Sequence, residues 1–138
     1  MGMGEWIYNN EVVRGHSIYP VCHSTLNAVS RRDYGNTYSF RPDIECLDIE
    51  CLDMDTYEKN VLRKGQPDCT VDAVIGISTY ENNRVSSPRL LLVELRMDYD
   101  NIKNLSKTAM ENKVIYTKKL LGRKVAIELK SIFLFKEK

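Results

Sequence analysis

The chain has 138 residues, of which 43% are hydrophobic and 28% are charged. This balance is typical of a globular protein and excludes intrinsic disorder. The length predicts one domain over residues 1–138, with residues 1–15 as an N-terminal extension. The longest strongly apolar run, residues 90–93, is far shorter than the roughly 20 residues of a membrane-spanning helix. Since the first residues also lack the features of a signal peptide, we expect a soluble cytoplasmic protein with no membrane partner.

The formal net charge of +1 conceals an asymmetry along the chain. Residues 1–58 carry a net charge of −6, residues 59–100 are neutral and residues 101–138 carry +7. A basic final third can attract nucleic acid, whereas the acidic first part can attract a basic protein. Helix surfaces exposed to solvent would give the same pattern.

Cysteine and histidine offer no evident metal site. The cysteines are Cys22, Cys46, Cys51 and Cys69. No two of them have the CxxC spacing of zinc or iron–sulfur ligands, so we expect free, buried thiols. His16 and His23 lie seven residues apart, where packing or surface roles are commoner than catalysis.

The first half of the chain predicts one long helix and an ambiguous region. Apolar residues at helical spacing predict a helix over residues 16–32, with a stripe of Ile18, Cys22, Leu26 and Val29. Residues 37–40 favour a strand. The repeated Asp-Ile-Glu-Cys-Leu of residues 43–52 fits neither the strand nor the helix period, so the structure of residues 37–65 stays open. We favour a strand through the forties and a helical turn near residues 55–62.

The second half predicts a hairpin, a helix and a strand. Residues 71–79 and 89–97 are rich in β-branched and apolar residues, and the connection between them has Asn82 and Asn83 at its tip. Residues 101–121 predict a basic helix that ends before Gly122. Residues 125–135 predict an alternating strand whose change of phase we attribute to a β-bulge. The expected fold is α/β, with a mixed central sheet of about four or five strands flanked by helices.

Each strand of the predicted hairpin contains one carboxylate, Asp72 in the first and Glu94 in the second. A charge in an apolar strand costs several kcal/mol unless it is paired, hydrogen-bonded or bound to a metal. Two acids on adjacent antiparallel strands can meet on one face and form an oxygen site suited to Mg²⁺. Such an ion can activate water and neutralise charge on a phosphate.

The order of elements, together with Asp72 and the Glu94-Leu95-Arg96 triplet, resembles the PD-(D/E)XK (restriction-endonuclease-like) nuclease superfamily. The resemblance covers about residues 16–135. It implies that Asp72 and Glu94 hold Mg²⁺, that Leu95 lends a backbone carbonyl, and that Arg96 occupies the place of a lysine that positions the attacking water. It also implies that the chain cuts or binds nucleic acid.

Several residues depart from or extend this pattern. Arg96 keeps its proton and cannot act as a base, although it can orient water or clamp a phosphate. Asp68, which follows Pro67, is an alternative to Asp72 as the metal ligand. The resemblance also implies an acid contributed by the first helix. No acid lies within residues 17–32, and Glu11, just before the helix, is the nearest one. The expected nucleic-acid approach is lined by Arg89, Lys103 and Lys107.

A structural interpretation stands beside the catalytic one. Asp72 can cap a strand end, and Glu94 can pair with Arg96 or Arg89 on a half-exposed strand. The chain would then be a non-catalytic protein–protein interaction module, such as a toxin-neutralising or assembly partner. The 8 tyrosines are compatible with such an interface.

Overall fold

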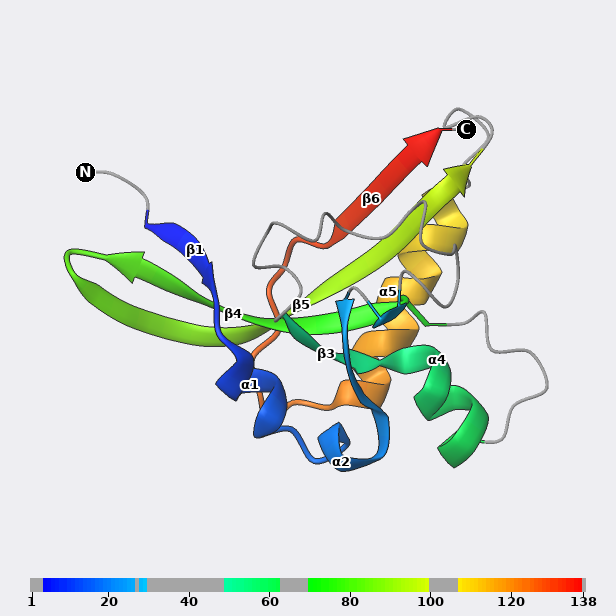
Figure 1. The fold of residues 1–138 in the computed structure, drawn as a ribbon, viewed down its shortest axis with the longest axis horizontal. Helices are drawn as coiled ribbons and strands as arrows, with labels where there is room; N and C mark the ends of the chain where they lie inside the picture. The colour runs from blue at the N-terminus through cyan, green and yellow to red at the C-terminus, as the bar shows by residue number, and fades with distance from the viewer. Residues whose placement is uncertain (1–3, 27, 30–48, 63–69, 100–106, 138) are drawn as a thin grey trace.

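The structure is a computed structural model that describes residues 4–26, 28–29, 49–62, 70–99 and 107–137. The strand expected at residues 37–40 lies outside the described residues, as do Cys46 and Cys69. Elements are drawn in Figure 1 and named by its labels.

A mixed sheet forms the centre of the described structure and has six strands rather than four or five (Figure 1). Four strands pair antiparallel in the order β2, β3, β4, β5, and β6 then pairs parallel with β5. β1 pairs antiparallel with the far half of β4. The strands are β1 (Glu5–Tyr8), β2 (His23–Thr25), β3 (Glu50–Asp53), β4 (Ala73–Glu81), β5 (Arg84–Tyr99) and β6 (Ile132–Glu137). The expected α/β class with a mixed sheet is confirmed.

The helices pack mainly on one face of the sheet. They are α1 (Asn10–Arg14), α2 (Tyr19–Cys22), α4 (Met54–Tyr57), the π-helical η3 (Glu58–Leu62) and α5 (Lys107–Leu121). Each of the α-helices just given contributes buried residues to one core. The expected N-terminal extension therefore contains two elements of the fold, because β1 joins the sheet and α1 joins this core. None of the described helices is long and apolar enough to cross a bilayer.

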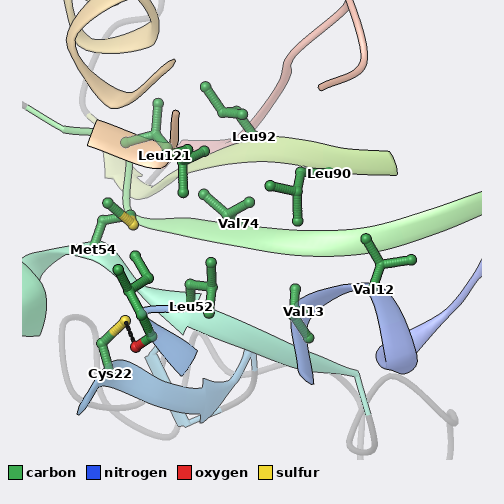
Figure 2. Close-up of a cluster of buried hydrophobic side chains, with 11 residues drawn as sticks. Val12, Val13, Cys22, Leu52, Met54, Val74, Leu90, Leu92 and Leu121 are labelled. Atoms are coloured by element: carbon green, nitrogen blue, oxygen red, sulfur yellow. Dashed lines mark hydrogen bonds between the residues drawn. The ribbon is translucent and has the colours of Figure 1, made fainter. Parts of the chain in front are cut away.

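Alternating side chains of the strands fill two cores on opposite faces of the sheet. The first core contains Val74, Leu90 and Leu92. Figure 2 shows Val74 between Val13 of α1 and Leu121 of α5. The second core contains the intervening residues, among them Ala73, Ile75, Leu91 and Val93. Since Glu94 follows Leu92 by two residues, it lies on the face that α5 covers.

The expected helix over residues 16–32 is wrong as one continuous element. Within this range α2 covers Tyr19–Cys22, and the chain then extends as β2, which pairs with β3. The described residues 26, 28 and 29 are helical again. All four residues of the predicted stripe are buried, but Ile18 and Cys22 join the first core whereas Leu26 and Val29 join the second. One straight helix cannot bury a single stripe in cores on both faces of a sheet, so the chain is extended where it changes face.

The hairpin, the helical turn and the last helix are confirmed. β4 and β5 meet at Asn82 and Asn83, whose φ angles of 53° and 60° fit a type I′ turn. The helical turn near residues 55–62 is α4 with η3. α5 ends before Gly122, whose φ is 78° and whose N–H donates to the Lys118 carbonyl at 3.2 Å.

The strand expected over residues 125–135 is correct only from Ile132 onward. Before β6, the chain meets β5 in a single parallel bridge between Ile127 and Leu90. Glu128 explains why the ladder does not extend from there. Its carboxylate pairs with Arg89 and accepts the Lys130 N–H at 3.1 Å, a local bond that competes with strand pairing.

Gly76 is required by the close approach of the segment before α1. A Cβ at this position would lie 2.2 Å from the Asn9 carbonyl oxygen and 2.7 Å from Cβ of Val12. We expect Gly76→Ala to lower the free energy of unfolding by about 2 kcal/mol, measured by urea denaturation. Gly15→Ala is the control, because its nearest neighbour would be 3.5 Å away. Equal unfolding midpoints for the two variants would contradict this account.

Cys22 and Cys51 are buried, as expected. Burial, reinforced by the negative charge of Asp53, raises the pKa of the Cys22 thiol to about 12. Thiolate is the reactive form, so iodoacetamide at pH 8 should leave Cys22 unmodified in the native protein and modify it in urea. Peptide mass mapping makes the comparison, and alkylation of native Cys22 would contradict the buried position.

Candidate functional site

Glu94 is a carboxylate buried inside the sheet. Its side chain lies in β5 and is 1% exposed. Nζ of Lys113, from α5, lies 2.8 Å from Glu94 Oε2, and the backbone N–H of Asp72 donates to Glu94 Oε1 at 3.0 Å. Both carboxylate oxygens therefore have a donor, which offsets the cost of removing the charge from water.

Asp72 lies opposite Glu94. It immediately precedes β4, and the pairing of Ala73 with Val93 places the two acids side by side when the register is extended by one residue. Asp72 is half-buried. The structure thus brings together the two carboxylate residues singled out in the sequence, while their roles in metal binding and catalysis stay predictions.

Thr117 connects Lys113 to the segment before Asp72. Its buried hydroxyl accepts the Val71 N–H at 3.0 Å and donates to the Lys113 carbonyl at 2.6 Å. The contacts form a closed ring from Lys113 to Glu94, Asp72, Val71, Thr117 and back to Lys113. A ring of this kind restricts the position of α5 relative to both strands.

Glu58, contributed by η3, is another buried acid, as is Asp53 at the end of β3. The Thr70 hydroxyl donates to Glu58 Oε1. Among the described residues, Glu58 Oε2 has no hydrogen-bond partner. Neither Glu58 nor Lys113 was singled out in the sequence, because one acid among seven between residues 43 and 58 and one lysine in a basic helix carry no local signal.

Arg89 lies away from Glu94. Its Nε is 2.9 Å from Glu128 Oε1, its Nη1 donates to Thr79 Oγ1 at 3.0 Å, and its guanidinium lies over the Trp6 ring. Of the two pairings that the structural interpretation allowed for Glu94, the one with Arg89 is therefore wrong. Lys113 from α5 is a cation beside Glu94 that neither alternative named.

The other candidates are placed only in part. Glu11 is exposed in α1 and pairs with Arg14 at 2.8 Å. Arg96 lies in β5, where its backbone pairs with Phe135, but its side chain is outside the described part of the structure. Lys103, Asp68 and the side chain of Lys107 are also outside it.

A further polar cluster is centred on Glu50 in β3. The Tyr19 hydroxyl donates to Glu50 Oε1 at 2.6 Å, and the Arg14 guanidinium donates to both of its oxygens. The hydrogen bond from Arg14, with that from Tyr19, holds the pKa of Glu50 below its usual value. These contacts tie α1 and α2 to β3, a structural role.

The chemistry of the Asp72–Glu94 pair fits Mg²⁺. This ion binds oxygen ligands and usually takes one or two carboxylates together with waters or phosphate oxygens. The described residues contain no group of three or more His, Cys, Asp or Glu that could hold a metal. If Asp72 and Glu94 hold Mg²⁺, as the sequence predicts, the remaining ligands would be waters or phosphate oxygens.

Comparisons with protein-family models, with curated proteins and with solved structures find no match for this chain.

The Glu94–Lys113 pair can be tested through stability. Lys113→Met leaves a buried carboxylate without its cation, so we expect the free energy of unfolding to fall by about 3 kcal/mol. The double variant Lys113→Met with Glu94→Gln removes the uncompensated charge and should recover part of this loss. Urea denaturation of the wild type, Lys113→Met, Glu94→Gln and the double variant forms a double-mutant cycle, which measures the coupling energy between the two side chains. Strictly additive effects would contradict a direct interaction.

Proposed function

We propose that this chain is a PD-(D/E)XK-like protein that hydrolyses phosphodiester bonds of nucleic acid with the help of Mg²⁺. The observation that carries the proposal is the juxtaposition of Asp72 and Glu94 through the Asp72 N–H, on the sheet face covered by α5. The order β4, β5, α5, β6 supports it as well, since this is the later part of the series of elements on which the resemblance rests, whereas the first helix of that series is not one continuous element.

In this proposal Asp72 and Glu94 hold the ion. When bound, Mg²⁺ supplies charge neutralisation at the phosphate and lowers the pKa of water. The +7 charge of residues 101–138 favours the approach of a nucleic acid, with Lys103 and Lys107 on that path. Arg89 would bind a phosphate oxygen of the nucleic acid only after its ion pair with Glu128 is broken.

A protein-interaction module is the second candidate, favoured by a different observation. Figure 1 shows the far part of the β4–β5 hairpin, with β1 beside it, extending beyond the helices. This hairpin arm exposes Trp6, Tyr8, Tyr80 and Val85. Aromatic residues are enriched in protein interfaces. In this candidate the Glu94–Lys113 pair is structural and needs no metal.

Cleavage assays distinguish the two candidates. With Mg²⁺ or Mn²⁺ and plasmid, single-stranded DNA and RNA as substrates, we expect the wild-type protein to cut at least one substrate. Asp72→Asn and Glu94→Gln each remove one anionic metal ligand and should reduce the cleavage rate by about 100-fold or more. Glu81→Gln is the matched control, because Glu81 is an exposed carboxylate at the tip of the hairpin.

Two results would count against the nuclease. Cleavage that is equal in wild type and in both site variants would come from another site or from a contaminant. A wild-type protein that cuts none of the substrates, with either metal, would favour the interaction module.

A further inference from the structure

We propose that two copies of this chain associate through the outer edge of β1, so that their β1 strands pair antiparallel about a two-fold axis at Ile7. The proposal concerns the hairpin arm, and it goes beyond the proposed nuclease function without depending on it. It also gives the interaction-module candidate a partner, namely a second copy of the chain.

β1 is an edge strand of the hairpin arm. In the part of the chain that the structure describes, β1 pairs with β4 alone. The Asn9 N–H continues this ladder by donating to the Gly76 carbonyl at 2.9 Å. Since the backbone groups of an antiparallel strand alternate in direction, those of Ile7 also point toward β4. The backbone groups of Trp6 and Tyr8 therefore point outward, away from β4.

The opposite edge of the arm, formed by β5, carries features that hinder strand pairing. Pro88 has no N–H, and Ser87 has a φ of 53° where the register between β4 and β5 shifts. Proline and β-bulges are two means by which proteins protect exposed strand edges. β1 has neither, because its sequence Glu-Trp-Ile-Tyr lacks proline and its register with β4 is continuous. One protected and one unprotected edge indicate that the unprotected edge is used for pairing.

The charge of the arm favours a second copy over a nucleic acid or a strongly charged protein. Residues 5–8 and 77–89 contain two acidic and two basic side chains, so their net charge is zero. Arg89, one of the two bases, is already paired with Glu128. A nucleic-acid surface requires an excess of cations, and a charged protein requires a surface of the opposite sign. A neutral surface does not repel a copy of itself.

A two-fold axis at Ile7 makes the β1 edge complementary to itself. Trp6 then lies opposite Tyr8 of the second copy, and Tyr8 lies opposite Trp6 of the second copy. Each of these pairs exchanges two N–H···O=C bonds, which uses the outward backbone groups of both strands. Opposite residues lie on the same face of a sheet, so each Trp–Tyr pair is a cross-strand aromatic contact. These contacts would cover Trp6 and Tyr8, which are 42% and 64% exposed.

The size of this interface predicts a weak, reversible dimer. Two short strands and four aromatic side chains bury less than the roughly 1,200–2,000 Å² of stable interfaces. We therefore expect a dissociation constant of micromolar order. Figure 1 shows the arm extending beyond the helices, so two arms placed side by side would form one sheet from β1, β4 and β5 of each copy.

Sedimentation velocity of the full chain, from low to high micromolar concentration, tests the association. We expect the wild type to pass reversibly from monomer to dimer as its concentration rises. Tyr8→Lys and Trp6→Glu each remove one ring from both aromatic pairs and should weaken the dimer by about 10-fold or more. Tyr80→Lys is the matched control, because Tyr80 is 43% exposed on the same arm but belongs to β4.

A mixture of the two variants tests the register. When a Tyr8→Lys copy pairs with a Trp6→Glu copy, the introduced ammonium and carboxylate lie opposite each other and the second aromatic pair is intact. The mixture should therefore dimerise several-fold more strongly than either variant alone. Trp6→Glu also leaves an attractive group for Arg89, whose guanidinium lies 5.5 Å from the centroid of the Trp6 ring.

A disulfide at position 7 tests the position of the axis. Ile7 lies opposite itself in a non-hydrogen-bonded pair, with Cα atoms about 4.5 Å apart, and disulfides span about 4.4–6.8 Å. Mild oxidation of Ile7→Cys should give a covalent dimer on a non-reducing gel. Val85→Cys is the control, because Val85 is exposed on the same arm but belongs to β5. Oxidised wild type shows how much the native cysteines contribute.

The proposal is overturned if the wild type stays monomeric at every concentration, or if Ile7→Cys is cross-linked no more than Val85→Cys. A dimer that Tyr8→Lys and Trp6→Glu leave unchanged also overturns it, since that dimer would use another surface. If either of these variants does not fold, as judged by circular dichroism, the comparison of Ile7→Cys with Val85→Cys decides. None of these results depends on whether the chain cuts nucleic acid, so the nuclease proposal stands or falls separately.

Discussion

The charge of Glu94 is the constraint on which the centre of this fold depends. An ionised carboxylate within a hydrophobic sheet is stable only when other groups replace its hydrogen bonds to water and compensate its charge. Here an ammonium from α5 and a backbone N–H from the start of β4 do so. Because these donors come from elements that are far apart in the chain, one buried charge links β4, β5 and α5. Removing either donor would cost more than the loss of one contact, since the charge would remain.

The register of β5 places Glu94 on the face of the sheet where these donors lie. Leu90 and Leu92 point into the first core, and Leu91 and Val93 point into the second. A shift of one residue would move Glu94 to the second core, away from α5 and among apolar side chains. The hydrophobic alternation of β5 and the compensation of Glu94 therefore select the same register. The tight Asn82–Asn83 turn, with φ positive at both residues, is consistent with that register from the other end of the hairpin.

The sequence predicts this region well because its signals are local. β-Branched and apolar runs mark both strands, and antiparallel pairing is enough to bring Asp72 next to Glu94. The partner of Glu94 has no such signal, since the choice between Arg89, Arg96 and a helix lysine depends on how α5 packs. The helix expected at residues 16–32 fails for a related reason. Its apolar spacing predicts which residues are buried, and all four residues of the stripe are buried. The spacing does not indicate that these residues enter two different cores.

Position 113 carries a structural demand that apolar packing alone does not meet. The ammonium of Lys113 neutralises Glu94 and thereby ties α5 to β5. Thr117, one helical turn later, ties the same helix to the segment before β4 through the Val71 N–H. Apolar burial is non-directional, whereas an ion pair and a hydrogen bond have a preferred geometry. Because the two polar contacts lie four residues apart on one face of α5, they fix the rotation of the helix about its axis as well as its position on the sheet.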